Sequence, residues 1–225
     1  MDDHILSIIE LVLLILTFAS AIFAIIRIFR KSIPMYFQLI VCAVSCNALA
    51  YLYNFLINLV MNDGNGWMYL GDWGNLGMQI FFLAANFGQF DSIIDGNNEK
   101  FKKQRRLAFI APAVLLAIRI PALLNLNAFV LNEKILLVIV TVIVMLASYF
   151  CLKMILIRDP EDIFLEGVKP ANACALLYFL TDQIYLLSTM YELKTLKIIL
   201  GYCLYIILIA IPLAADWGSR KWKTL

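Results

Sequence analysis

The sequence predicts an all-α polytopic integral membrane protein, a bundle of seven transmembrane helices joined by short loops. Three observations predict it: the composition, the number of long apolar segments, and the division of basic residues between their ends. The chain of 225 residues is 63% hydrophobic and 15% charged. Soluble domains are about 45–50% apolar. A soluble fold is therefore not expected.

Seven apolar segments are each long enough to cross a bilayer, whose hydrocarbon core of about 30 Å requires about 20 helical residues. They cover residues 5–28, 35–61, 69–94, 106–126, 135–157, 171–191 and 195–216. The short loops leave no room for a second domain, so we expect one domain over residues 1–225. Segments one to three and five to seven cross in the same directions, which permits a weak 3+1+3 pseudo-repeat of residues 1–94 and 135–219.

Basic residues predict the orientation. Of the 18 Lys and Arg residues, 14 lie at alternate segment ends, in residues 27–31, 100–106, 153–169 and 220–223. Cytoplasmic loops carry an excess of Lys and Arg. We therefore expect an outside N-terminus, a cytoplasmic C-terminus and a multi-pass protein of the plasma membrane.

Polar side chains inside the segments follow helical spacing. Lipid cannot satisfy such groups, so they face the bundle interior or a water-filled cavity. The second segment places its polar residues at i, i+4, i+7 and i+11, which is one helix face. The third and sixth segments each carry a similar stripe. The three stripes are Asn47, Tyr51, Asn54 and Asn58; Asp72, Asn75, Gln79 and Asn86; and Tyr178, Thr181, Asp182, Tyr185 and Thr189.

The third segment also carries glycines and alanines on its other faces, including Gly74 and Gly77. Small residues let helix backbones approach closely in lipid. We therefore expect this helix at the bundle centre, with Gln79 and Asn86 facing the interior.

Arg119 is the costliest residue of the spans, at about 2.5–3.5 kcal/mol near mid-span on insertion scales. Asp182 is its best partner because both residues fall roughly 10–13 Å below the outer surface at 1.5 Å per residue. We expect a direct ion pair or one shared cavity that opens outward. A structural clamp and a ligand anchor both explain such a pair.

These residues favour a protein that binds a small polar or anionic solute in an outer-half cavity, either as a carrier or as a ligand-sensing, receptor-like subunit. Arg119 would hold the anionic group. The candidate ligand-binding residues are Arg119, Asp182, Gln79, Asn75, Asn54, Asn58, Tyr178 and Tyr185.

Two alternatives belong to other classes. An intramembrane enzyme acting on a lipid or lipid-linked substrate would use Asp72 or Asp91 with Asp182 as acid and base. A non-catalytic accessory subunit would use its polar residues only for helix packing. No catalytic motif is recognisable, so an enzyme is the less favoured class.

No cofactor and no metal is expected. The single histidine, His4, makes a histidine-based metal site untenable. Residues Ile198–Ala215 of the last segment hold no lysine that could bind retinal. The expected partners are the lipid bilayer, a small solute and a possible cytoplasmic or membrane protein. Nucleic acid is not expected, because the basic run 100–106 is explained by its role in orientation.

Overall fold

The computed structural model describes residues 3–29, 33–61, 69–87, 99–125, 131–157 and 163–223. These residues form helices and short turns, with no strand among them. The helices are α1 (Asp3–Ile28), α2 (Met35–Met61), α3 (Tyr69–Asn86), α4 (Lys102–Ala108), α5 (Ile110–Leu124), α6 (Leu131–Leu156), α7 (Ile163–Met190) and α8 (Lys194–Lys223). A short 3-10 turn, Glu99–Phe101, precedes α4. The predicted all-α class is confirmed.

Six stretches within the described residues are long and apolar enough to cross a membrane. They are Ser7–Ile28, Met35–Ile57, Glu99–Leu124, Lys134–Leu156, Glu166–Met190 and Lys194–Lys221. The third of these contains both α4 and α5, which meet at Phe109 in a helical conformation. A multi-pass integral membrane protein is therefore the class that the helices support.

The predicted third span, 69–94, is not among the six. Its described helix, α3, has 18 residues that include an aspartate and several amides and glycines. These residues lower its hydropathy, and residues 88–94 lie outside the described part of the chain. The count of seven spans stays a prediction.

Two helices are longer than the sequence predicted. α7 begins at Ile163 and runs through Pro170, whereas the predicted segment began at residue 171. α8 continues to Lys223, seven residues beyond the predicted end. The α7 extension contains Glu166 and Lys169, and the α8 extension contains Ser219 and three basic residues. These charged residues explain why hydropathy alone ended the segments too early.

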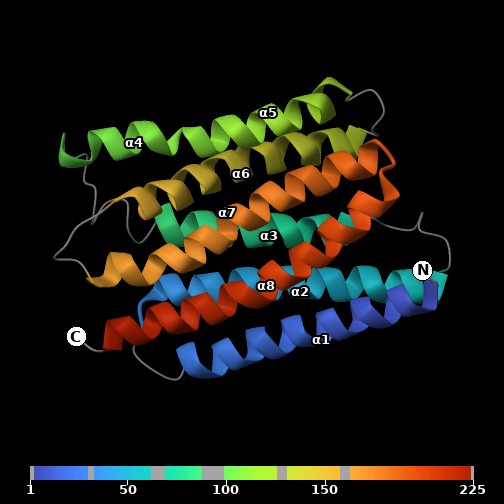
Figure 1. The fold of residues 1–225 in the computed structure, drawn as a ribbon, viewed down its shortest axis with the longest axis horizontal. Coiled ribbons are helices and arrows are strands. Elements are labelled where there is room, and N and C mark those ends of the chain that lie inside the picture. The colour runs from blue at the N-terminus through green and yellow to red at the C-terminus, as the bar shows by residue number, and fades with distance from the viewer. Residues whose placement is uncertain are drawn as a thin grey trace.

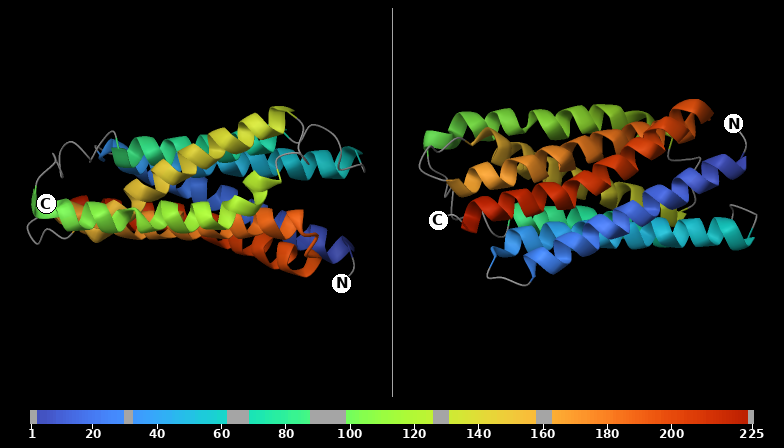
Figure 2. Two further views of the ribbon diagram at one scale, coloured as in Figure 1. Left: turned by 90° about the horizontal axis from the view of Figure 1, so that it is seen from above. Right: turned by 60° about the horizontal axis from the view of Figure 1, so that its bottom comes forward.

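The helices run roughly along one axis (Figure 1). In the views of Figure 2, α2 and α3 lie side by side, as do α7 and α8, and α1 crosses between the two pairs and packs on α2 and α8. The start of α1 and the end of α8 lie at opposite ends of the bundle. We call the half with the start of α1 and the α7–α8 turn the N-side half, and the half with the end of α8 the C-side half.

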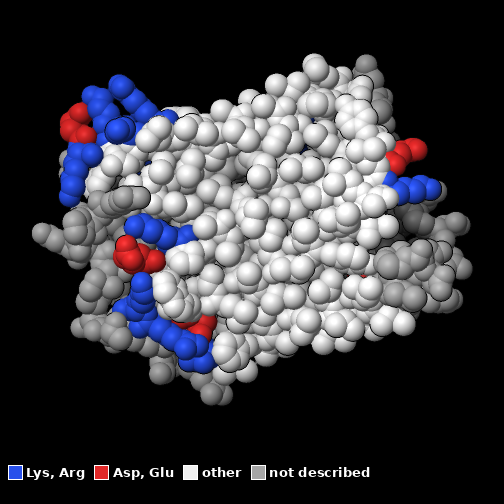
Figure 3. Space-filling view, viewed as in Figure 1, with Lys and Arg blue, Asp and Glu red and all other residues white. Residues whose placement is uncertain are grey.

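Charge separates along the same axis (Figure 3). The middle of the visible face is almost free of Lys, Arg, Asp and Glu, while basic side chains gather at the C-side end. Large apolar side chains such as Ile15, Ile22 and Val142 are exposed in this middle band of the helices. Lipid contact explains their exposure. The described basic residues of the C-side end are Arg27, Lys100, Lys102, Lys103, Arg105, Arg106, Lys153, Lys169, Arg220 and Lys221.

In the C-side half, α7 and α8 touch through glycines. A Cβ added at Gly218 would overlap the carbonyl oxygen of Gly167, and one added at Gly167 would lie 2.8 Å from that of Gly218. Asp216, only 3% exposed, pairs there with Arg27 of α1 at 3.1 Å and accepts a bond from Arg220 Nε at 3.0 Å. This half is therefore both tightly packed and held by ion pairs.

α3 packs against α2 and α6. A Cβ added at Gly74 would overlap that of Ala50 in α2 and lie 3.0 Å from the Cys46 carbonyl oxygen. Gln79 and Asn86 are fully buried within the protein. The prediction that the amides of this helix face the interior is confirmed.

Candidate functional site

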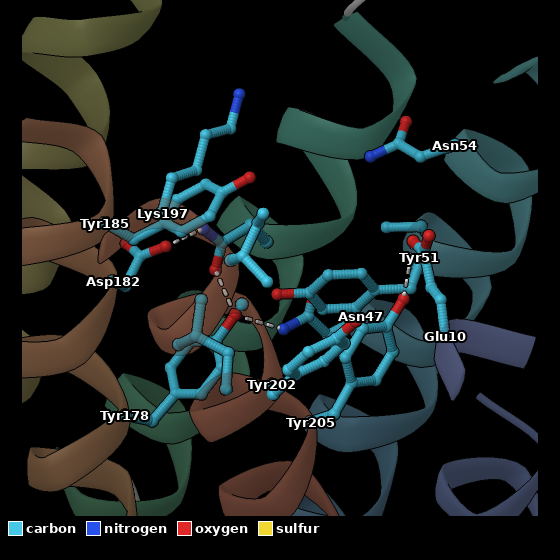
Figure 4. Close-up of a pocket in the computed structure, with 15 residues that line it drawn as sticks. Glu10, Asn47, Tyr51, Asn54, Tyr178, Asp182, Tyr185, Lys197, Tyr202 and Tyr205 are labelled. Carbon is cyan, nitrogen blue, oxygen red and sulfur yellow. Dashed lines mark hydrogen bonds between the residues drawn. The ribbon is translucent and has the colours of Figure 1, made fainter. Parts of the chain in front are cut away.

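A cavity of about 330 Å³ lies in the N-side half (Figure 4). Five helices, α1, α2, α3, α7 and α8, contribute to its wall. The described residues that line it are Glu10, Asn47, Ala50, Tyr51, Asn54, Asn75, Tyr178, Asp182, Tyr185, Lys197, Ile198, Gly201, Tyr202, Leu204 and Tyr205. Most of these side chains can form hydrogen bonds, which is unusual at bilayer depth.

One wall comes from α7, where Tyr178, Asp182 and Tyr185 follow each other at i, i+4 and i+7 and so share a helix face. The Asp182 carboxylate accepts two amide hydrogen bonds. Asn75 of α3 donates to Oδ1 at 3.3 Å, and Gln183 donates to Oδ2 at 3.2 Å. The carboxylate is thereby held in a fixed orientation beside the cavity.

A hydrogen-bond chain extends from this carboxylate to α2. The Tyr178 hydroxyl donates to Asn75 Oδ1 at 3.5 Å and accepts from Asn47 Nδ2. Gln79 Nε2 also donates to Asn75 Oδ1, at 3.4 Å. The amides and the hydroxyl therefore tie α2, α3 and α7 together beneath the cavity.

Arg119 of α5 belongs to this network without reaching the cavity. Its side chain is buried, and Nη1 donates to Oε1 of Gln183. Since Gln183 Nε2 donates to Asp182, one carboxamide bridges the guanidinium and the carboxylate. The two charges also attract each other electrostatically.

Neither expected arrangement of Arg119 and Asp182, a direct ion pair or one shared cavity, is found among the described residues. No ion pair joins these two described residues, and Arg119 is not among the described residues of the cavity wall. Gln183 takes the position between them. Gln183 was not predicted, because an amide next to an aspartate has no distinctive pattern.

The opposite wall contains a second carboxylate, that of Glu10 in α1. Tyr205 of α8 donates its hydroxyl to Glu10 Oε1 at 3.3 Å. The ring of Tyr205 also packs on that of Tyr51, with 4.6 Å between the ring centroids. In the view of Figure 4, Glu10 and Asp182 lie on opposite sides of the site.

α8 supplies a further wall of the cavity, which was not predicted from the sequence. Lys197, Gly201 and Tyr205 recur at i, i+4 and i+8, and Tyr202 lies beside them. The Lys197 ammonium nitrogen lies 5.9 Å from the ring centroid of Tyr185. The spacing was a usable signal, but tyrosines and a lysine near a helix end are also common at membrane interfaces.

The predicted site residues divide into three groups. Asn54, Asn75, Tyr178, Asp182 and Tyr185 line the cavity. Gln79 lies buried behind Asn75, and Arg119 lies behind Gln183. The side chains of Asn58, Asp72 and Asp91 lie outside the described residues.

Chemically, the described wall offers two carboxylates, one ammonium, the hydroxyls of five tyrosines and three amides. No group of three or more His, Cys, Asp and Glu side chains comes together within the described residues. No protein-family model matches the chain, and neither a curated protein nor a solved structure similar to it was found. The residues and the volume of the cavity are therefore the basis for a functional proposal.

Proposed function

We propose that this is a multi-pass plasma-membrane protein that binds a small polar solute in the N-side cavity and acts as a ligand-sensing subunit. The observation that carries the proposal is the cavity itself, with hydrogen-bonding side chains from five helices around about 330 Å³. Ligand pockets commonly enclose about 300–1,000 Å³ with a few placed polar groups. Polar groups at bilayer depth are costly and usually functional.

The proposed orientation places the cavity toward the outside. Basic residues gather at the C-side end, and the positive-inside rule assigns that end to the cytoplasm. The cavity then lies in the outer half, where a solute outside the cell can reach it.

A polar solute is supported better than an anionic one. The anionic interpretation depended on Arg119, which donates to Gln183 and lies outside the described cavity wall. The described wall carries Glu10 and Asp182 against a single Lys197. An anion would meet more negative than positive charge there.

Sensing is favoured over transport by the packing of the C-side half. A carrier must open that half to release its solute. The Gly167–Gly218 contact leaves no space between α7 and α8, and Asp216 ties α1 to α8. A sensor needs only a small shift of helices, which a separate cytoplasmic or membrane protein partner would read.

Binding is tested with purified protein in lipid nanodiscs. The thermal midpoint is measured with a panel of small solutes: choline, glycine betaine, glycerol, acetate and phosphate. At least one should raise the midpoint saturably, because a ligand that binds only the folded state stabilises it. Gly201→Leu, which places bulk in the cavity wall, should abolish the shift. Gly201→Ala is the matched smaller change, since its Cβ would lie 3.8 Å from Tyr185.

Absence of any saturable shift across the panel would contradict the proposal, as would a shift that Gly201→Leu leaves intact. Proteoliposomes loaded with the stabilising solute separate sensing from transport. A sensor should leave the efflux rate equal to that of empty liposomes. Protein-dependent efflux that Gly201→Leu removes would make the protein a carrier.

A further inference from the structure

We infer that the solute bound in the N-side cavity is a small organic cation, an ammonium carrying apolar substituents. This inference rests on the proposed function and names the chemical class of its ligand. Three properties of the cavity carry it: the charge of its wall, its aromatic surface, and the placement of the protein's own ammonium group.

The charge of the described wall favours a cation. Two carboxylates, Glu10 and Asp182, and one ammonium, Lys197, line the cavity, a balance of one negative charge. Both carboxylates are partly exposed to the cavity. In Figure 4 they lie on opposite sides of the site, so a cation between them is attracted from both sides.

Aromatic side chains make up much of the remaining surface. The tyrosines come from three helices: Tyr51, Tyr178, Tyr185, Tyr202 and Tyr205. The face of an aromatic ring attracts cations, and cages of such rings recognise quaternary ammonium groups. The rings also suit the alkyl substituents of such a ligand, which a hydrated metal ion does not have.

Lys197 is an ammonium group of the protein itself that already lies near one of these tyrosine rings. Its ammonium nitrogen lies 5.9 Å from the ring centroid of Tyr185, inside the range of a cation–π contact. Lys197 lies one turn from Gly201 and is itself part of the cavity wall. An ammonium ligand would share these surfaces with it, so the lysine is expected to compete.

The test compares two probes of equal shape, choline and 3,3-dimethylbutan-1-ol, in which a carbon replaces the quaternary nitrogen. Binding to the protein in nanodiscs is measured by calorimetry. Choline should bind at least about tenfold more tightly than the neutral alcohol, since cation–π and charge attraction act on choline alone.

Variants of the cavity wall test which residues cause the tighter binding of choline. Glu10→Gln and Asp182→Asn should each weaken choline binding at least about tenfold and leave binding of the neutral alcohol unchanged. Lys197→Gln should strengthen choline binding. Tyr202→Leu, which removes the ring, should weaken choline binding more than Tyr202→Phe, which keeps it.

The possible results separate the two proposals. Equal affinity for choline and the alcohol, or a preference for acetate, overturns the organic cation while a solute-binding cavity stands. Choline binding that survives Glu10→Gln and Asp182→Asn together also overturns it. If no solute of any charge binds, both the inference and the proposed function are wrong.

Discussion

The two halves of the bundle are built from the same helices but pack them differently. In the N-side half, α7 and α8 contribute two walls of a cavity lined by tyrosines, amides and two carboxylates. In the C-side half they touch backbone to backbone at Gly167 and Gly218. Two glycines of α8 differ in the same way, because a Cβ added at Gly201 would meet only the Tyr185 ring at 3.8 Å, whereas one added at Gly218 would overlap another backbone.

The two halves also differ in the contacts that hold their helices together. Ion pairs and close packing fix the relative positions of α1, α7 and α8 at the C-side end. The hydrogen-bond chain through Asn75 and Tyr178 holds the cavity wall with weaker, rearrangeable contacts. In the proposed sensor, the ligand would shift the N-side half against the C-side half.

The largest expected effect separates the two glycines. Gly218→Leu should lower the free energy of unfolding by at least about 3 kcal/mol, because its side chain would collide with backbone that cannot move aside. Gly201→Ala should change it by less than about 1 kcal/mol, since its Cβ meets only ordinary contacts. Thermal midpoints in detergent compare the two variants. Similar losses would remove the contrast between the halves.

A smaller effect is expected where Arg119 supports the cavity from behind. Arg119→Leu should cost about 2 kcal/mol, because Gln183 Oε1 then loses its charged donor in a buried position. Gln183→Leu should cost a similar amount. The double variant should cost less than the sum by about 1 kcal/mol or more, which is the signature of a direct interaction. Additive losses would show that the two residues act independently.

The C-side ion pairs should contribute less to the free energy of unfolding than their short distances suggest. Asp216→Asn should cost about 1–2 kcal/mol, since the carboxylate is buried but the Arg27 and Arg220 side chains are 41% and 54% exposed. Glu99→Gln is the control. Its carboxylate is 78% exposed beside Lys102, so its loss should stay within about 0.5 kcal/mol. If Asp216→Asn leaves the free energy of unfolding unchanged, the ion pairs of Asp216 do not stabilise the contact between α1 and α8.

The smallest effect concerns one hydroxyl of the cavity wall. Tyr178→Phe should cost about 1 kcal/mol, because Asn47 and Asn75 each lose one hydrogen-bond partner. Tyr53→Phe, an outlying tyrosine of α2 that is not part of the described cavity wall, should be neutral. Equal thermal midpoints for both variants would show that the hydroxyl does not tie α2 to α7.

The sequence was sufficient where exposing a side chain to lipid would have a high free-energy cost. Buried amides at helical spacing had to face protein, and Gln79 and Asn86 do. Small residues at Gly74 had to mark a close helix contact, and α2 packs there. The period of each helix and the expense of a polar group in lipid sufficed for these predictions.

The sequence was insufficient where the relative rotation of two helices decides the contact. Arg119 and Asp182 were placed at similar depth, but depth does not show that Gln183 reaches between them. The α8 wall was missed for a similar reason. A tyrosine faces lipid headgroups or a cavity with equal ease, and only packing against α1 and α7 decides which.

In the proposed function, the N-side half is open to solute from outside and the C-side half is closed. This difference is tested by labelling single cysteines on α8, in a variant whose native cysteines are replaced by serine, with a membrane-impermeant trimethylammonium methanethiosulfonate on intact cells. Gly201→Cys lies in the cavity wall, and Ala215→Cys replaces a fully buried residue of the C-side half. Gly201→Cys is expected to react several-fold faster than Ala215→Cys, and choline is expected to slow the reaction of Gly201→Cys. Equal rates at the two positions, or labelling of Gly201→Cys from the cytoplasmic side alone, would contradict it.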